Sequence, residues 1–165
     1  MLIAAILLGA LFGETVLTRA ILQSMTEDAR VDLHRQVWAA IWQRPWTGYG
    51  GASFASVFPA FSAPPLSGEV IFDRSHSTYL ALWFDMGLVA GSLPLLVVAS
   101  AALRLVRRLG DGGGRAPLLA ALGVIAVAGV HSLMDFSLEL YANAVVFTFI
   151  LAVGLAGARP KPEGA

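Results

Sequence analysis

Long apolar runs alternate with short polar stretches along this chain, and the lengths of these runs predict helices that cross a membrane. The apolar runs cover about residues 2–22, 87–106, 116–133 and 141–157, and about 20 apolar residues are needed to cross a hydrocarbon core. The pattern predicts an all-α transmembrane fold of about four spans, in a single membrane domain over residues 1–165. Pro94 lies inside the second run, where we expect it to kink the helix.

Residues 24–86 have the pattern of a large loop that contains one amphipathic helix. Ser24 and Glu27 have the spacing of a capping box at the start of this helix. Arg30 and His34 then share one face of it with apolar residues at three- and four-residue steps: Val37, Trp38 and Ile41. Beyond the helix, glycine and proline residues break every periodicity from residue 46 to residue 72, which predicts an irregular loop.

The composition changes this picture only by narrowing the class of protein. Apolar residues make up 57% of the chain and charged residues 13%, which is the balance of a membrane protein rather than a soluble domain. The 11 basic and 11 acidic residues cancel, so no basic surface argues for a nucleic-acid partner. The absence of cysteine excludes disulfides and thiolate chemistry.

Positive charge is concentrated in one short segment and in the C-terminal tail, and this predicts the orientation of the spans. The arginines of the segment are Arg104, Arg107, Arg108 and Arg115, and the tail carries Arg159 and Lys161. Because short basic segments remain in the cytoplasm, residues 24–86 and the turn at 135–139 are expected on the outer, periplasmic side. Candidate polar residues from distant parts of the sequence would then gather at one outer face.

His76 lies directly before the apolar stretch 78–86 that leads into the second run, in the sequence Asp73-Arg74-Ser75-His76-Ser77-Thr78-Tyr79-Leu80. A histidine has a pKa near neutrality and can accept a proton from a hydroxyl group, so His76 is a candidate general base. The alternative is that His76 caps the helix that follows. Arg30, on the apolar face of its helix, needs an anionic partner, which could be an acid of the chain, Glu69 or Asp73, or a bound phosphate.

His131 and Asp135 are four residues apart near the outer end of the third apolar run. At this spacing the carboxylate can orient the imidazole, or both groups can bind a cation. Two ligands are weak support for a metal site, and a mutually satisfied polar pair favours a structural or accessory role. We therefore predict no metal site.

Several short motifs, taken in their order and spacing, resemble the C-terminal half of the O-antigen ligase and O-antigen polymerase family. These motifs are Arg30; Arg44-Pro45-Trp46-Thr47-Gly48-Tyr49-Gly50; Phe54; Phe58-Pro59; His76-Ser77-Thr78-Tyr79-Leu80; Asp85-Met86-Gly87; and His131-Ser132-Leu133-Met134-Asp135-Phe136. The resemblance implies a partial GT-C-like ligase fold in the bacterial inner membrane, multi-pass, with its active face in the periplasm. It also implies that the chain is the C-terminal portion of a larger ligase.

The resemblance further implies a glycosyltransferase that needs no cofactor and no metal. Its donor would be a glycan on undecaprenyl diphosphate, its acceptor a sugar hydroxyl of lipid A-core or another glycan, and membrane lipids would surround it. His76 would then act as the general base and Arg30 would contact the diphosphate, with Arg74 and His34 as further substrate-binding residues.

The chain also departs from the family pattern. Ser77 stands where the family usually has asparagine and Asp85 where it usually has glutamate, and the family has more spans and a further arginine upstream. Two alternatives to an active ligase therefore stay open. One is a transporter element, similar to relatives named as inorganic-carbon transporters, in which Glu14, His131 and Asp135 line a polar path. The other is a truncated, non-catalytic remnant.

Overall fold

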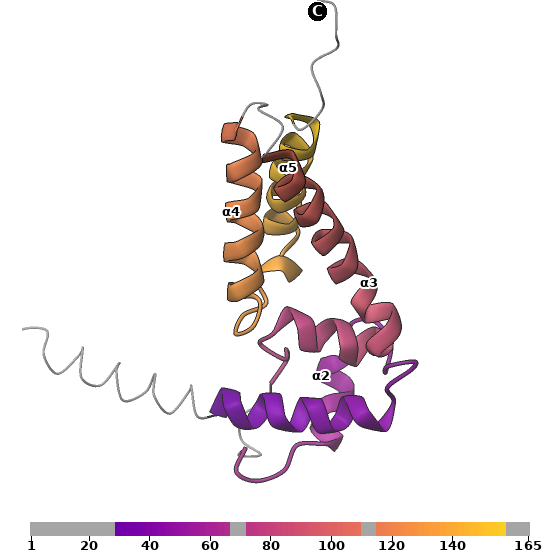
Figure 1. Cartoon of the computed structure of the whole chain (residues 1–165). Helices are drawn as coiled ribbons and strands as arrows, with labels where there is room; N and C mark the ends of the chain where they lie inside the picture. The colour runs from indigo at the N-terminus through magenta and orange to yellow at the C-terminus, as the bar shows by residue number, and fades with distance from the viewer. Residues whose placement is uncertain (1–28, 67–71, 110–114, 158–165) are drawn as a thin grey trace, which may run out of the picture.

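The computed structural model describes residues 29–66, 72–109 and 115–157, and the regular structure within these ranges is helical, with no strand among them (Figure 1). The predicted all-α class is confirmed at this level. The first predicted span, with Glu14, lies outside the described residues, as do the capping residues Ser24 and Glu27 and the candidate acid Glu69.

The three other predicted spans are helices. They are α3 (Thr78–Arg108), α4 (Arg115–His131) and α5 (Tyr141–Gly157). Of the described helices, α3, with 31 residues, is long and apolar enough to cross a membrane, whereas α4 and α5 are shorter apolar helices of 17 residues. The predicted bounds of α5 agree with the structure, and α4 ends two residues before the prediction because the chain turns at residues 132–134. The four-span topology and the periplasmic side of residues 24–86 stay predictions.

Helix α3 is broken at Gly87 into two halves, residues 78–86 and residues 88–108. Gly87 has φ 77° and ψ 169°, a conformation that is not helical and that favours glycine. Pro94 lies inside the second half, and the described non-helical residue of α3 is Gly87. This break was not predicted from the sequence, and it makes the first half run across the end of the bundle while the second half joins it (Figure 1). The kink expected at Pro94 stays a prediction.

The loop after the helix at residues 29–43 replaces the backbone hydrogen bonds that α3 loses at this break. In an unbroken helix the Leu88 N–H would donate to the Phe84 carbonyl. Instead the Leu88 N–H donates to the Pro45 carbonyl (2.7 Å), and the Phe84 carbonyl accepts from the Tyr49 N–H (2.9 Å). The Gly50 N–H likewise donates to the Asp85 carbonyl (2.9 Å). The backbone polar groups at the break are thus hydrogen-bonded by residues outside the helix.

Glycine is required on both sides of this break because the two backbones touch. A Cβ on Gly87 would lie 2.6 Å from the Trp46 carbonyl, and a Cβ on Gly48, which has φ 63°, would lie 2.5 Å from the Asp85 carbonyl oxygen. These distances are far below van der Waals contact, so neither position has room for a side chain. The residues 45–50 and the break in α3 form one unit, which we call the loop clamp.

The helix at residues 29–43 packs on the first half of α3 and on two short helices, α2 (Phe54–Val57) and η1 (Phe58–Ala60). This packing buries the apolar positions of that helix together with aromatic rings of the other elements: Leu33, Val37, Ala40, Ile41, Phe54, Phe58, Leu66, Leu80 and Phe84. Val37 and Ile41 are fully buried, as the amphipathic pattern predicted, whereas Trp38 is 39% exposed. The predicted irregular loop therefore contains two helical turns that close a small core.

A second core holds the second half of α3 against α4 and α5. It consists of Leu105, Leu118 and Ala121, with partly buried apolar residues around them. Gly154 of α5 allows the closest approach, because a Cβ there would lie 2.4 Å from the Ala121 Cβ. Small residues at such crossings are typical of helices that pack within a membrane.

Candidate functional site

His76 lies in the short segment that enters α3, in a left-handed backbone conformation with φ 52°. The N-cap of α3 is Ser77, which is extended and makes no side-chain cap bond. The interpretation of His76 as a helix cap is therefore wrong. A non-glycine residue in this conformation is uncommon and needs support from its surroundings.

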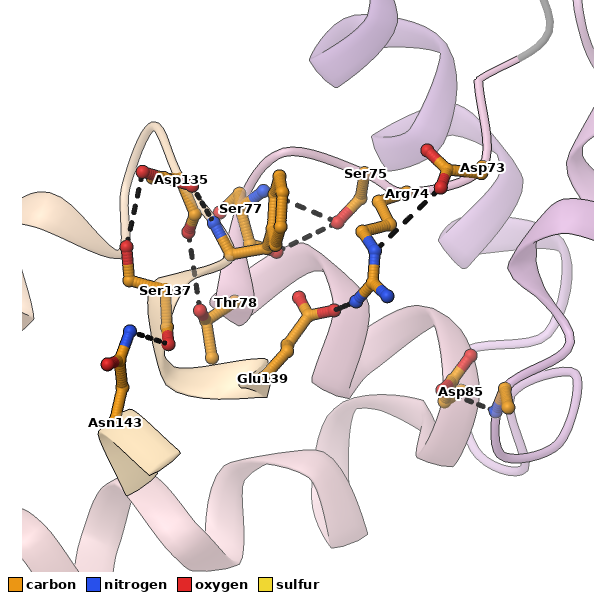
Figure 2. A network of polar contacts seen from close by, with 12 residues as sticks. Asp73, Arg74, Ser75, Ser77, Thr78, Asp85, Asp135, Ser137, Glu139 and Asn143 are labelled. Carbon is orange, nitrogen blue, oxygen red and sulfur yellow. Dashed lines mark hydrogen bonds and ion pairs between the residues drawn. The ribbon is translucent and has the colours of Figure 1, made fainter. Parts of the chain in front are cut away.

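That support comes from the turn that follows α4. The Ser77 hydroxyl donates to the Ser132 carbonyl (3.2 Å), and the Thr78 N–H is directed at the Ser132 and Asp135 carbonyls (3.1 and 3.3 Å). The Thr78 hydroxyl donates to the Asp135 carbonyl (3.3 Å), and the Ser75 hydroxyl donates to the Ser77 carbonyl (2.8 Å). Figure 2 shows this network joining the two segments. Because Ser75 and Ser77 are buried, these bonds hold His76 firmly in place.

His34 approaches the same segment from the helix at residues 29–43. Its Nε2–H donates to the His76 carbonyl at 3.3 Å, which leaves Nδ1 as the acceptor nitrogen when the ring is neutral. Burial lowers the pKa of His34 below its usual value, and this effect exceeds the opposing effect of the hydrogen bonds to the His76 and Ser75 carbonyls. The lowered pKa of His34 favours its neutral form at pH 7.

Arg30 supplies positive charge to the two histidines. Burial and then the Arg30 charge lower the pKa of His76, although Asp73 and Asp135 oppose this. The Arg30 Nε atom is buried and has no hydrogen-bond partner among the described residues. Of the two acids predicted as its partner, Glu69 lies outside the described residues, and Asp73 lies 3.9 Å from Arg74. An unpartnered buried N–H is energetically costly, so Arg30 Nε stands out among the described polar atoms.

Arg74 is held by two residues that the sequence analysis missed. Its Nη1 donates to the Glu139 Oε2 (3.0 Å), and its guanidinium lies over the Phe136 ring, 4.9 Å from the ring centroid. The Phe136 ring also makes an edge contact with His76, with centroids 5.4 Å apart. Burial raises the pKa of Glu139, and the Arg74 interaction opposes this. The available signal was an acid and an aromatic residue in a turn predicted to face the same side as His76.

The predicted pair of His131 and Asp135 is present in the structure. His131 Nδ1 lies 3.5 Å from Asp135 Oδ2, and the Ser137 hydroxyl lies 3.2 Å from both groups. The second Asp135 oxygen accepts the Phe136 N–H at 2.6 Å. These contacts fix the turn whose carbonyl oxygens accept hydrogen bonds from Ser77 and Thr78. Within the described ranges, no three His, Cys, Asp or Glu residues are grouped so that they could hold a metal ion.

The predicted site residues therefore come from three separate segments that meet at one end of the bundle. Arg30 and His34 belong to the first, Arg74 and His76 to the second, and Asp135 to the third. This end is opposite to the C-terminal end of α3, where Arg107 and Arg108 lie (Figure 1). The arrangement combines a neutral imidazole with fixed guanidinium charges, and it can accept a proton beside a bound anion. The functional roles of the individual residues stay predictions.

A family model described as O-Antigen ligase matches residues 1–95, which is more than half of the chain. The matched region contains Arg30, His34, Arg74 and His76 and ends inside α3. The turn with Asp135 and Glu139 lies beyond it. No curated protein and no solved structure matches the chain.

Proposed function

Because the chain belongs to the O-antigen ligase family of membrane glycosyltransferases, we propose that it transfers a glycan from undecaprenyl diphosphate to a sugar hydroxyl at the periplasmic face of the bacterial inner membrane. The acceptor would be lipid A-core or another glycan. The observation that carries the proposal is that the Arg30 charge acts on His76, and that the buried Nε–H of Arg30 has no partner among the described residues.

The transfer needs one proton acceptor and one anion-binding group. The acceptor hydroxyl oxygen forms a bond to the anomeric carbon of the donor glycan, while the bond from that carbon to the diphosphate oxygen breaks. The hydroxyl proton passes to a ring nitrogen of His76, which is neutral at pH 7 because burial and Arg30 lower its pKa. The bonding electrons leave with undecaprenyl diphosphate, and the Arg30 guanidinium stabilises the charge that develops there.

Two further residues would bind the donor or acceptor. Arg74 is fixed by Glu139 and Phe136, so its remaining N–H groups are directed without a loss of side-chain freedom on binding. Arginine suits the task because its planar N–H groups match pairs of phosphate oxygens. His34 uses Nε2 on the His76 carbonyl, and its Nδ1 is the nitrogen available to a substrate hydroxyl.

The described spans offer no observation that favours the transporter alternative. The sequence has no Asp, Glu, Lys, Arg or His at residues 87–103, 116–130 or 142–157, which make up most of these helices. A cleft of about 460 Å³ between α4 and α5 has mainly apolar walls, and its polar residues, which include His131, Ser137 and Asn143, lie at one end. His131 and Asp135 lie at one end of these helices, which supports a role there rather than in a path across the membrane.

The substitution His76→Asn tests the proposal. Asparagine tolerates the left-handed backbone of residue 76, so the fold should be kept while proton acceptance is lost. We expect membrane insertion and protease resistance like those of the parent chain, and a loss of roughly 10²-fold to 10⁴-fold in glycan transfer.

The measurement is transfer from a polyprenyl-diphosphate-linked glycan to its acceptor in membrane vesicles that hold the full chain. Ala52→Asn is the matched control, because Ala52 is exposed and is the other described non-glycine residue with positive φ, at 58°. The control should transfer normally. Normal transfer by His76→Asn would show that His76 is not the general base.

A further inference from the structure

All four tryptophans of the chain lie in one region of the structure, beside the start of the second half of α3. They are Trp38, Trp42, Trp46 and Trp83, which we call the tryptophan cluster. The ring of Trp38 contacts the rings of Trp42 and Trp83, with centroids 5.8 and 5.7 Å apart. Trp46 follows Trp42 by four residues, in the loop clamp. None of these side chains has a role in the proposed chemistry.

The cluster is fixed to the first turns of the apolar half of α3. The Trp83 indole N–H donates to the Ser92 hydroxyl at 3.0 Å. The Trp46 backbone lies against Gly87, the last residue before that half begins. The apolar half then exposes large hydrophobic side chains: Val89 59%, Leu93 56%, Leu96 60% and Val97 67%. The tryptophan cluster therefore borders directly on the apolar surface of the helix that is long enough to cross a membrane.

The exposure of the cluster points to a specific occupant. Trp42 is 57% exposed and Trp46 is 73% exposed, although both are large and mainly apolar. Indole rings with an apolar body and one N–H gather where hydrocarbon meets lipid headgroups. We propose that the tryptophan cluster contacts the headgroup region of the outer leaflet and anchors the helix at residues 29–43 to the membrane surface.

This contact would also set the depth of the candidate site. Arg30, His34, Trp38 and Trp42 follow one another at four-residue steps, so they form one stripe along the helix. If Trp38 and Trp42 lie among the headgroups, the side chains of Arg30 and His34 lie at nearly the same depth in the membrane. That is the level at which the phosphates of a lipid lie. The anchoring itself does not depend on glycan transfer, because it rests on the position of the tryptophans relative to α3.

The unaltered chain allows a direct test, because its intrinsic tryptophan fluorescence comes from the cluster alone. The full chain is reconstituted into phosphatidylcholine vesicles with a nitroxide either near the headgroup or deep in the acyl chain. We expect the shallow nitroxide to quench about twice as much of the emission as the deep one, and iodide in the water to quench little. Strong quenching by iodide would place the cluster in water and overturn the proposal.

A pair of single-cysteine variants resolves the contact to individual positions, and the chain has no other cysteine. Trp42→Cys and Gln43→Cys carry a spin label, and its collisions with oxygen and with a water-soluble nickel chelate are measured. Gln43 is the matched control, since it is exposed and points about 100° away around the same helix. The proposal requires oxygen access with chelate protection at residue 42 and chelate access at residue 43. Protection from both reagents at residue 42 would show that protein covers the cluster, and equal chelate access at both would show water; either result overturns it.

Discussion

Replacing Gly87 by alanine should destabilise the chain, because the substitution acts on both the backbone and the loop clamp. The conformation at φ 77° and ψ 169° is accessible mainly to glycine, and an alanine there costs about 1–3 kcal/mol. The new Cβ would also lie 2.6 Å from the Trp46 carbonyl, so the loop must move. Loss of one or two of the clamp hydrogen bonds adds about 1–2 kcal/mol. We expect a total of about 2–5 kcal/mol.

The measurement is thermal unfolding of the purified chain in detergent, followed by intrinsic fluorescence. At about 3 °C per kcal/mol for a chain of this size, the Tm of Gly87→Ala should fall by roughly 6–15 °C. Gly123→Ala is the matched control, because a Cβ on Gly123 in α4 would meet no atom within 4 Å. Alanine is the better helix former, so the control should be as stable as the parent or slightly more stable. A Gly87→Ala chain with the Tm of the parent would refute the clamp.

The remaining predictions concern the site and the topology. Arg30→Lys should lose most of the transfer activity in membrane vesicles, although the charge is kept. The control is the same change at Arg35, whose side chain is 78% exposed, and it should keep the activity. Equal activity of the two variants would exclude paired contact of Arg30 with phosphate oxygens. In intact spheroplasts an impermeant thiol reagent should label Ser53→Cys but not Gly113→Cys, and the reverse pattern would invert the orientation. Burial and then the Arg30 charge lower the pKa of His76 from its usual 6.5. Transfer should therefore fall as the pH drops through this lowered pKa and the ring becomes protonated. An acid limb at or above pH 6.5 in the pH–rate profile would contradict the role of the neutral ring.

The helices of the bundle could be predicted because their ends are marked by local sequence. The apolar run of α5 begins at Tyr141, after a short polar turn, and the structure has the same bounds. The position of the break in α3 could not be predicted in this way. Proline removes a hydrogen bond within its own helix, which is a local signal. The helix breaks at Gly87 because residues 45–50, some forty positions earlier, supply the missing hydrogen-bond partners.

The sequence indicated which segments would meet at the candidate site, but not the contacts between their residues. Positive charge and motif order indicated that Arg30, His76 and Asp135 would face one side. The partner of Arg74 is Glu139, which is 65 positions away, and no periodicity connects the two. From the sequence, only His76 was considered as a cap of α3, whereas the structure has Ser77 at the N-cap, because His76 adopts a left-handed backbone.

The bonds between the His76 segment and the turn after α4 have a consequence for biosynthesis. Ser77 and Thr78 reach carbonyls that are 55 and 57 residues later in the chain. During synthesis His76 leaves the ribosome well before α4 is complete, so its segment lacks these acceptors until α4 and the turn after it have been made. We expect His76 to take its left-handed conformation late in assembly, so that, if it is the proposed proton acceptor, a half-made chain would not yet act on lipid.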